Sequence, residues 1–169
     1  MTNAQPQVDT SKVSDRRRLR FTTLADLRAD LATLERGEIA GSLRASGNWT
    51  PGQIFSHLAA FIEFAYDGYP PELSNPPWFI KALLRLRKRA MLAGGLPAGV
   101  KIPGIRGGTV GADQAPFPAA LARLRRALDR LEQTAPSVPN PVFGPLAHSE
   151  WITLHLRHAE LHLGFLRPS

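Results

Sequence analysis

The sequence predicts an all-α protein, a four-helix bundle with a long crossover between its second and third helices that carries a short extra helix. Three observations predict it. Apolar side chains recur three and four residues apart in four separate segments, which is the spacing of one face of a helix. No segment shows the two-residue alternation of a half-buried strand over more than a few residues. Connections rich in proline and glycine separate the four segments. Their lengths fit a bundle in which short loops join antiparallel helices and one long connection crosses over.

The first two predicted helices have clear boundaries. The first begins after Thr22, carries leucines at positions 24, 27, 31 and 34, and ends where Gly37 permits it. The second begins at Thr50, which can cap the free amides, and Gln53 completes a capping box. It runs to about Tyr66 and is apolar on most sides, so we expect it to lie deep in the fold.

The crossover and the last two helices follow. The crossover is rich in proline and contains one helical stretch at residues 78–92, because a structureless loop of that length would be unusual inside a domain. Leucines at positions 121, 124, 128 and 131 predict the third long helix, between Pro118 and Pro136. The fourth runs from about His148 to Leu166, with Pro168 beyond it.

Composition limits the classes of function. The chain of 169 residues contains no cysteine, which excludes iron–sulfur clusters, zinc ribbons and cysteine nucleophiles and leaves histidine and carboxylate as metal ligands. It has 21 Lys and Arg against 14 Asp and Glu, but no nucleic-acid-binding motif, so we expect no nucleic-acid partner. No apolar run is long enough to span a membrane, and charged residues interrupt any signal-peptide core, which predicts a cytoplasmic protein. Residues 1–19 are predicted to be a flexible arm and residues 20–169 a single bundle domain.

Three histidines share one face of the last predicted helix. At 100° per residue, His155, His158 and His162 lie within about 60° of one another around the helix axis. Trp151 shares that face, which turns it towards the bundle interior. His158 and His162 have the spacing by which one helix offers two imidazoles to one metal ion. Ala159 stands where a zinc-protease helix has glutamate, so that motif is excluded.

A fourth histidine lies on the second predicted helix. Burying an unpaired polar group costs about 1–3 kcal/mol, so His57 should have a partner in this apolar segment. His57, His158 and His162 are therefore candidate ligands of one metal ion. His155 is an alternative candidate for the third ligand, or else a supporting residue or a base. The alternative is that each histidine simply bonds a neighbouring carbonyl or hydroxyl. We expect His148 to lie at the surface or at a helix cap, and Gln53 to serve the capping box rather than the site.

Several motifs occur in an order and spacing typical of a known family. They are Arg17-Arg18-Leu19-Arg20-Phe21, Gly47-Asn48-Trp49-Thr50-Pro51-Gly52-Gln53 followed by His57-Leu58-Ala59, Asp67-Gly68-Tyr69-Pro70, Pro141-Val142-Phe143-Gly144-Pro145-Leu146, Glu150-Trp151, and His158-x-x-x-His162-Leu163. From about residue 16 to residue 166 the chain resembles an uncharacterised branch of the DinB-like superfamily. Its members are four-helix bundles in which one histidine of the second helix and an HxxxH pair of the last helix bind a divalent metal ion.

The resemblance implies that His57, His158 and His162 are the metal ligands. It also implies a metal-dependent activity, since some members of the superfamily are thiol S-transferases or related hydrolases, although it supplies no particular reaction for this branch. Leu161 and Gly164 replace a histidine and a glutamine that are frequent in the family. Neither change removes a ligand, but we expect them to alter the pocket or a dimer contact.

The expected function is that of a divalent-metal-dependent enzyme of thiol S-transferase or hydrolase type. Zn²⁺ or Ni²⁺ is the favoured ion, with Mn²⁺ and Fe²⁺ as further candidates, and His155 is the candidate catalytic proton acceptor. The expected partners are a small-molecule substrate such as an anionic thiol and a second copy in a homodimer. The alternative function is a non-catalytic bundle with a structural or absent metal, which docks to a partner or anionic membrane through the basic amphipathic residues 78–92. We expect instead that this helix packs through its apolar face and that its charged face is solvated.

Overall fold

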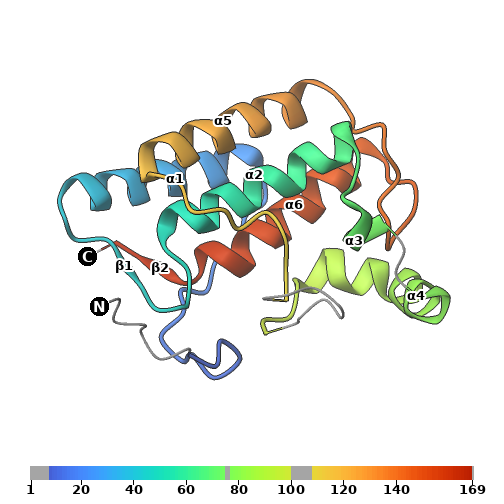
Figure 1. Ribbon diagram of the computed structural model, residues 1–169, viewed down its shortest axis with the longest axis horizontal. Helices are drawn as coiled ribbons and strands as arrows, with labels where there is room; N and C mark the ends of the chain where they lie inside the picture. Colours follow the sequence, from blue (N-terminus) through green and yellow to red (C-terminus); the bar gives the residue numbers. More distant parts are fainter. Residues whose placement is uncertain (1–7, 75–76, 100–107, 169) are drawn as a thin grey trace.

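The computed structural model describes residues 8–74, 77–99 and 108–168, and these residues are mostly helical (Figure 1). The helices are α1 (Leu24–Ile39), α2 (Pro51–Asp67), α3 (Pro71–Ser74), α4 (Trp78–Gly94), α5 (Phe117–Gln133) and α6 (His148–Leu163). Two short strands, β1 (Arg44–Ala45) and β2 (Leu166–Arg167), pair in antiparallel orientation. The prediction of the all-α class is confirmed.

The C-terminal end of α6 differs from the prediction. The helix ends at Leu163, so the expectation that it continues to Leu166 is wrong. The backbone N–H of Phe165 donates to the His162 carbonyl three residues back, which tightens the last turn. The chain then leaves the helix and Leu166 pairs with Ala45 in the small sheet. A strand of two residues is too short to show an alternating pattern, so periodicity does not predict it.

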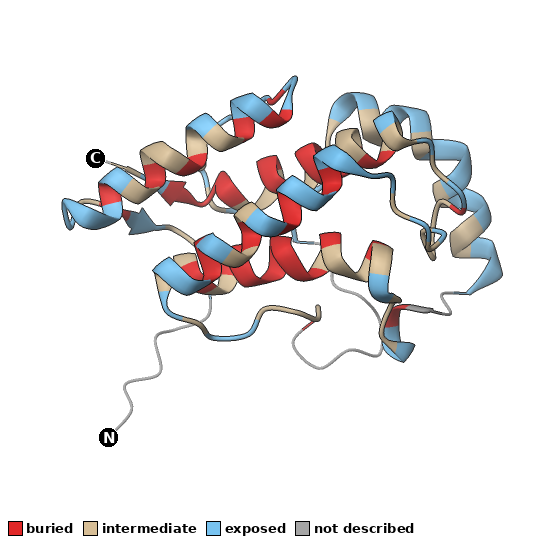
Figure 2. Cartoon of the chain, turned by 90° about the horizontal axis from the view of Figure 1, so that it is seen from above, coloured by how far each residue is buried: buried red, intermediate tan, exposed pale blue. Residues whose placement is uncertain are grey.

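Helices α1, α2, α5 and α6 share one hydrophobic core. Figure 2 shows that their buried residues face the centre of the group. The eight leucines at the predicted positions of α1 and α5 are all buried. Helix α2 lies between α5 and α6 and is buried on most sides, as its sequence indicates. The faces predicted from the apolar periodicity are therefore the faces that pack.

The start of α2 is fixed by side-chain capping. The Thr50 hydroxyl accepts from the Gln53 N–H at 3.2 Å, and the Gln53 side-chain oxygen accepts from the Thr50 N–H at 3.0 Å. The predicted capping box is thus confirmed. It sets the first turn of α2 and with it the place of His57, which lies one turn after Gln53.

The segment before α1 lies against the end of α6. Residues 1–7 of the predicted arm lie outside the described residues. The Arg17 backbone N–H donates to the Gly164 carbonyl at 2.8 Å, and the Arg17 guanidinium pairs with Asp30. Arg16 donates through Nη2 to the Leu161 carbonyl at 2.6 Å, which supplies a cation to the end of α6.

Helix α4 has the predicted position in the chain but not the expected packing. It contains no buried residue, and at the lower right of Figure 1 it lies outside the core of α1, α2, α5 and α6, with α6 as its neighbour. None of the helices in the described ranges is long and apolar enough to cross a membrane.

Candidate metal centre

Three histidines from two helices meet at one point of the molecule. His57 comes from α2, and His158 and His162 come from successive turns of α6. Each offers a ring nitrogen, and these three nitrogens all lie within 4.8 Å of one another. The structure thus brings together the three residues predicted as ligands.

The tautomer of His57 is set by the crossover segment. Its Nδ1 lies 2.8 Å from the backbone carbonyl oxygen of Val110. A carbonyl can only accept a hydrogen bond, so Nδ1 carries the proton and Nε2 presents its lone pair. A metal-ligating histidine is usually held by such a bond on its other nitrogen.

The spacing of the nitrogens fits a metal ion. His57 Nε2 lies 3.1 Å from His158 Nε2. A tetrahedral zinc ion with bonds of about 2.0–2.1 Å holds two nitrogen ligands about 3.3 Å apart. Small movements of the rings are therefore enough to place both lone pairs on one ion, and the donor set suits it.

Burial keeps the three imidazoles neutral at neutral pH. It lowers the pKa of His57 to about 4, against the opposing effect of the bond to Val110. Burial also places the pKa of His158 well below its ordinary value, and the neighbouring His162 and His57 lower it further. The pKa of His162 is low for the same main reason, with smaller contributions from His57 and the Arg16 charge. Neutral imidazoles bind metal without first releasing a proton.

Aromatic side chains surround the cluster. The Trp49 ring is stacked on the His162 ring, with centroids 5.3 Å apart and planes at 13°. Phe61 contacts His57 at 4.5 Å and His158 at 4.9 Å between centroids. These rings restrict the orientations of the imidazoles and give the site apolar walls.

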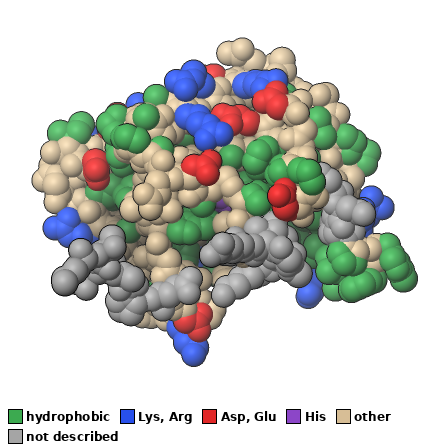
Figure 3. Space-filling view, viewed as in Figure 1, with side chains coloured by type: hydrophobic (Ala, Val, Ile, Leu, Met, Phe, Trp, Pro, Cys, Tyr) green, Lys and Arg blue, Asp and Glu red, His purple; other side chains and the backbone are tan. Residues whose placement is uncertain are grey.

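The centre is closed on one side and open on the other. His57 is 2% exposed, whereas His158 and His162 are half-buried. Figure 3 shows a small area of histidine surface in a hollow near the middle of the face seen in Figure 1. The open side of the cluster is therefore in contact with solvent.

The other predicted residues do not join the three ligands. His155 is 6% exposed and stacks on Trp151, with centroids 5.8 Å apart, and its Nε2 has no hydrogen-bond partner. Its role as proton acceptor stays a prediction. Gln53 is engaged in the capping box and donates to the Ala112 carbonyl at 3.4 Å. His148, the first residue of α6, bonds the Leu131 carbonyl through Nε2 at 2.6 Å.

The residues that sequence reasoning missed come mainly from outside the helices. Trp49 precedes the cap of α2, and Val110 lies in the crossover, so neither belongs to a periodic pattern. Phe61 had a signal, because it follows His57 by one helical turn and shares its face.

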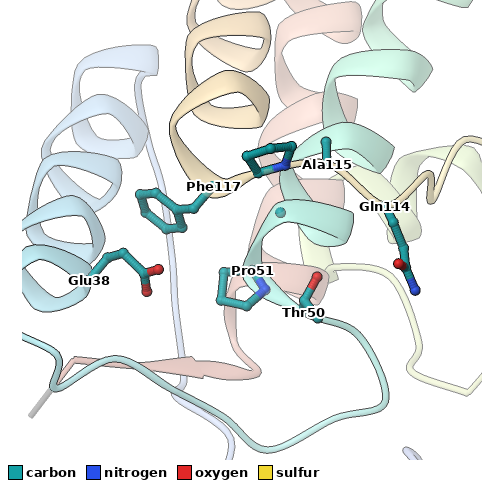
Figure 4. A pocket seen from close by; sticks show the side chains of 8 residues that line it. Glu38, Thr50, Pro51, Gln114, Ala115 and Phe117 are labelled. Atoms are coloured by element: carbon teal, nitrogen blue, oxygen red, sulfur yellow. The ribbon is translucent and has the colours of Figure 1, made fainter. Parts of the chain in front are cut away.

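A separate groove lies at the start of α2 and α5 (Figure 4). It has a volume of about 490 Å³ and is lined by Glu38, Thr50, Pro51, Gly52, Gln114, Ala115, Pro116 and Phe117. None of the three histidines lines it. Gly52 permits the close approach of the two segments there, because a Cβ at this position would collide with the Ala115 carbonyl oxygen.

The fold and the site define a mostly helical protein with a three-histidine cluster of the kind that can hold a metal ion. The chain matches the family described as "Protein of unknown function (DUF1569)" over residues 13–169, and it belongs to that family. No curated protein and no solved structure matches it. Because the family description names no activity, the function has to be argued from the site.

Proposed function

We propose that the protein is a divalent-metal-dependent enzyme whose ion is held by His57, His158 and His162. The observation that carries this proposal is the convergence of three neutral ring nitrogens within 4.8 Å, from two helices. Hydrogen bonding alone does not require three buried imidazoles to converge, whereas a shared metal ion does.

The proposal includes a DinB-like fold, in which α1, α2, α5 and α6 form a four-helix bundle and the chain from α2 to α5 is the long crossover. The shared core of these helices and the order of the elements support it. So does the position of the ligands, one on the second bundle helix and two on the last.

An all-imidazole ligand set suits Zn²⁺ or Ni²⁺, with Fe²⁺ and Mn²⁺ as weaker candidates. Three protein ligands leave the remaining positions of such an ion to water or substrate, and the bound ion would lower the pKa of that water or thiol. The chain's own part is to hold the imidazoles neutral and oriented. His57 is held through Val110, and His162 through its stack on Trp49.

The substrate class in this proposal is a small anionic molecule, such as an anionic thiol, with thiol transfer or hydrolysis as the reaction. The Arg16 guanidinium supports an anionic substrate, because it donates to the carbonyl of Leu161, the residue before His162, and so brings a positive charge to this end of α6. Its Nε is buried and has no hydrogen-bond partner. A cytoplasmic location, a homodimer and the lack of a nucleic-acid partner complete the proposal.

Metal-induced stabilisation tests the ligand set. Adding Zn²⁺ or Ni²⁺ to the full-length chain should raise its melting temperature, since an ion that binds only the folded state stabilises it. The substitution His158→Ala should abolish that rise. The substitution His148→Ala is the matched control and should keep it, because His148 lies outside the cluster. A rise that persists in His158→Ala means that the ion binds elsewhere.

Cobalt substitution tests the enzymatic part. A Co²⁺ ion on three imidazoles and a water gives a visible absorption spectrum, and ionisation of that water near neutral pH changes the spectrum. The proposal expects a spectral transition between about pH 6 and 9. A Co²⁺ spectrum that stays constant over this range favours a structural metal instead.

A further inference from the structure

Helix α4 presents its apolar side chains to solvent. Trp78, Phe79, Leu83 and Leu86 are 79%, 58%, 55% and 85% exposed. Most of the strongly exposed large apolar side chains of the described residues are on this one helix. Contiguous exposed apolar surface of this kind is typical of an interaction site, whereas single exposed apolar residues need no explanation.

The exposed apolar residues form a continuous stripe along the helix. At 100° per residue, Phe79, Leu83 and Leu86 lie within about 60° of one another around the axis. The exposed residues Ala82, Ala90 and Ala93 fall on the same side, and we call these six residues the apolar stripe. Figure 3 shows hydrophobic side chains gathered at the corner of the molecule that α4 occupies.

Arginines border the apolar stripe on both sides. Arg89 and Arg87 lie about 80° to either side of Phe79 around the axis, and both are exposed. The lysines point the other way: Lys88 is half-buried and pairs with Glu150 of α6 at 2.7 Å. The helix contains no acidic residue. The apolar face is thus the solvent-exposed one, contrary to the expectation from the sequence.

We propose that α4 is a docking surface for an anionic lipid membrane. The apolar stripe would enter the boundary between headgroups and acyl chains, as interfacial amphipathic helices do, and Arg87 and Arg89 would lie at the level of the lipid phosphates. Trp78, at the start of the helix, suits the same interface because its ring is amphipathic. The net charge of +7 attracts the whole chain to such a surface.

Two other occupants fit the surface less well. A second copy pairing through the same face would bring arginines opposite arginines, with no acidic residue in the helix to offset them. An acidic protein would need an apolar groove edged by carboxylates, whereas the apolar stripe is one unbroken face of an exposed helix. An anionic leaflet offers negative headgroups for the arginines and an apolar region for the apolar stripe in a single flat layer.

Vesicle binding tests the proposal with the full-length chain. The protein should sediment with vesicles of phosphatidylcholine containing about one third phosphatidylglycerol, and far less with phosphatidylcholine alone or at about 0.5 M salt. The substitution Leu86→Ser should weaken binding about tenfold or more, since it removes a buried leucine from the interface. The double substitution Arg87→Glu and Arg89→Glu should weaken it at least as strongly, and only on anionic vesicles.

Matched control variants separate α4 from general effects of charge and apolarity. Ile39→Ser replaces an apolar side chain that is 81% exposed on α1, and Arg126→Glu replaces an exposed arginine of α5. Ile39→Ser should bind vesicles as the original chain does. Arg126→Glu should weaken vesicle binding by no more than its change in net charge accounts for. Lipids brominated in their acyl chains should quench the fluorescence of the bound protein, and Trp78→Phe should remove most of that quenching.

Three results would overturn the proposal. One is a full-length chain that does not bind anionic vesicles, and another is binding that the Leu86 and arginine substitutions leave unchanged. The third is a chain that does not bind vesicles but forms a concentration-dependent dimer, which Leu86→Ser dissociates. That result would assign the surface to a second copy. The proposal does not depend on the metal, so all variants of α4 should keep the metal-induced rise in melting temperature.

Discussion

Mild acid should destabilise the metal-free protein, because its buried histidines resist protonation. Burial lowers the pKa of His57 and of His155 to about 4, whereas an unfolded histidine titrates at 6.5. Between these values the unfolded chain binds protons that the folded chain does not. The free energy of unfolding is therefore at its full value above pH 6.5 and falls as the pH is lowered towards 4.

The size of the effect follows from the two pKa values. Each histidine gives a slope of up to about 1.4 kcal/mol per pH unit within this window. Going from about pH 6 to about pH 5 should lower the free energy of unfolding by about 1 kcal/mol for each, or about 2 kcal/mol for the two. His158 and His162 add to the effect in the same direction, because burial also lowers their pKa.

Urea unfolding with a chelator present, followed by circular dichroism at the two pH values, measures this loss. His155→Phe and His155→Gln each remove one titrating group that lies outside the ligand cluster, so each should reduce the loss by about 1 kcal/mol. The pair separates loss of the proton site from changes in packing, since one replacement is apolar and the other is polar. Equal stability at both pH values, or a loss that neither substitution reduces, would refute the reasoning.

Two further substitutions test how the site and its supports are built. Trp49→Leu removes the ring stacked on His162 and should weaken metal affinity about tenfold in a chelator competition; an unchanged affinity in a folded variant would show that the stack does not orient the ligand. Gly52→Ala places a methyl group against the Ala115 carbonyl and should lower the free energy of unfolding by about 1–3 kcal/mol. Gly94→Ala is the control, because no atom lies near its added Cβ, and equal stability of the two glycine variants would contradict the close approach at Gly52.

Local patterns were sufficient to predict the helices and the three candidate ligands. The spacing of His158 and His162 follows from the geometry of a single helix, and the capping box fixes where α2 begins. The apolar helix α2, which packs against α6, then brings His57 to them. Each step depends only on residues close together in the chain and on the rule that apolar faces pack together.

Tertiary contacts decided the remaining features. The Val110 carbonyl reaches His57 because the crossover folds back over α2, and no residue pattern in the crossover encodes that approach. The same limit applies to α4. Its sequence shows an apolar stripe, but periodicity does not say whether the stripe faces the core or solvent, and the usual inward orientation does not hold here.

The metal content of full-length protein purified without an affinity tag tests the central claim most directly. Elemental analysis by mass spectrometry should find about one equivalent of a divalent transition metal per chain, and His158→Ala should lose it while His148→Ala keeps it. Less than about a tenth of an equivalent, together with no rise in melting temperature on adding Zn²⁺, Ni²⁺ or Mn²⁺, would contradict a metal centre at His57, His158 and His162.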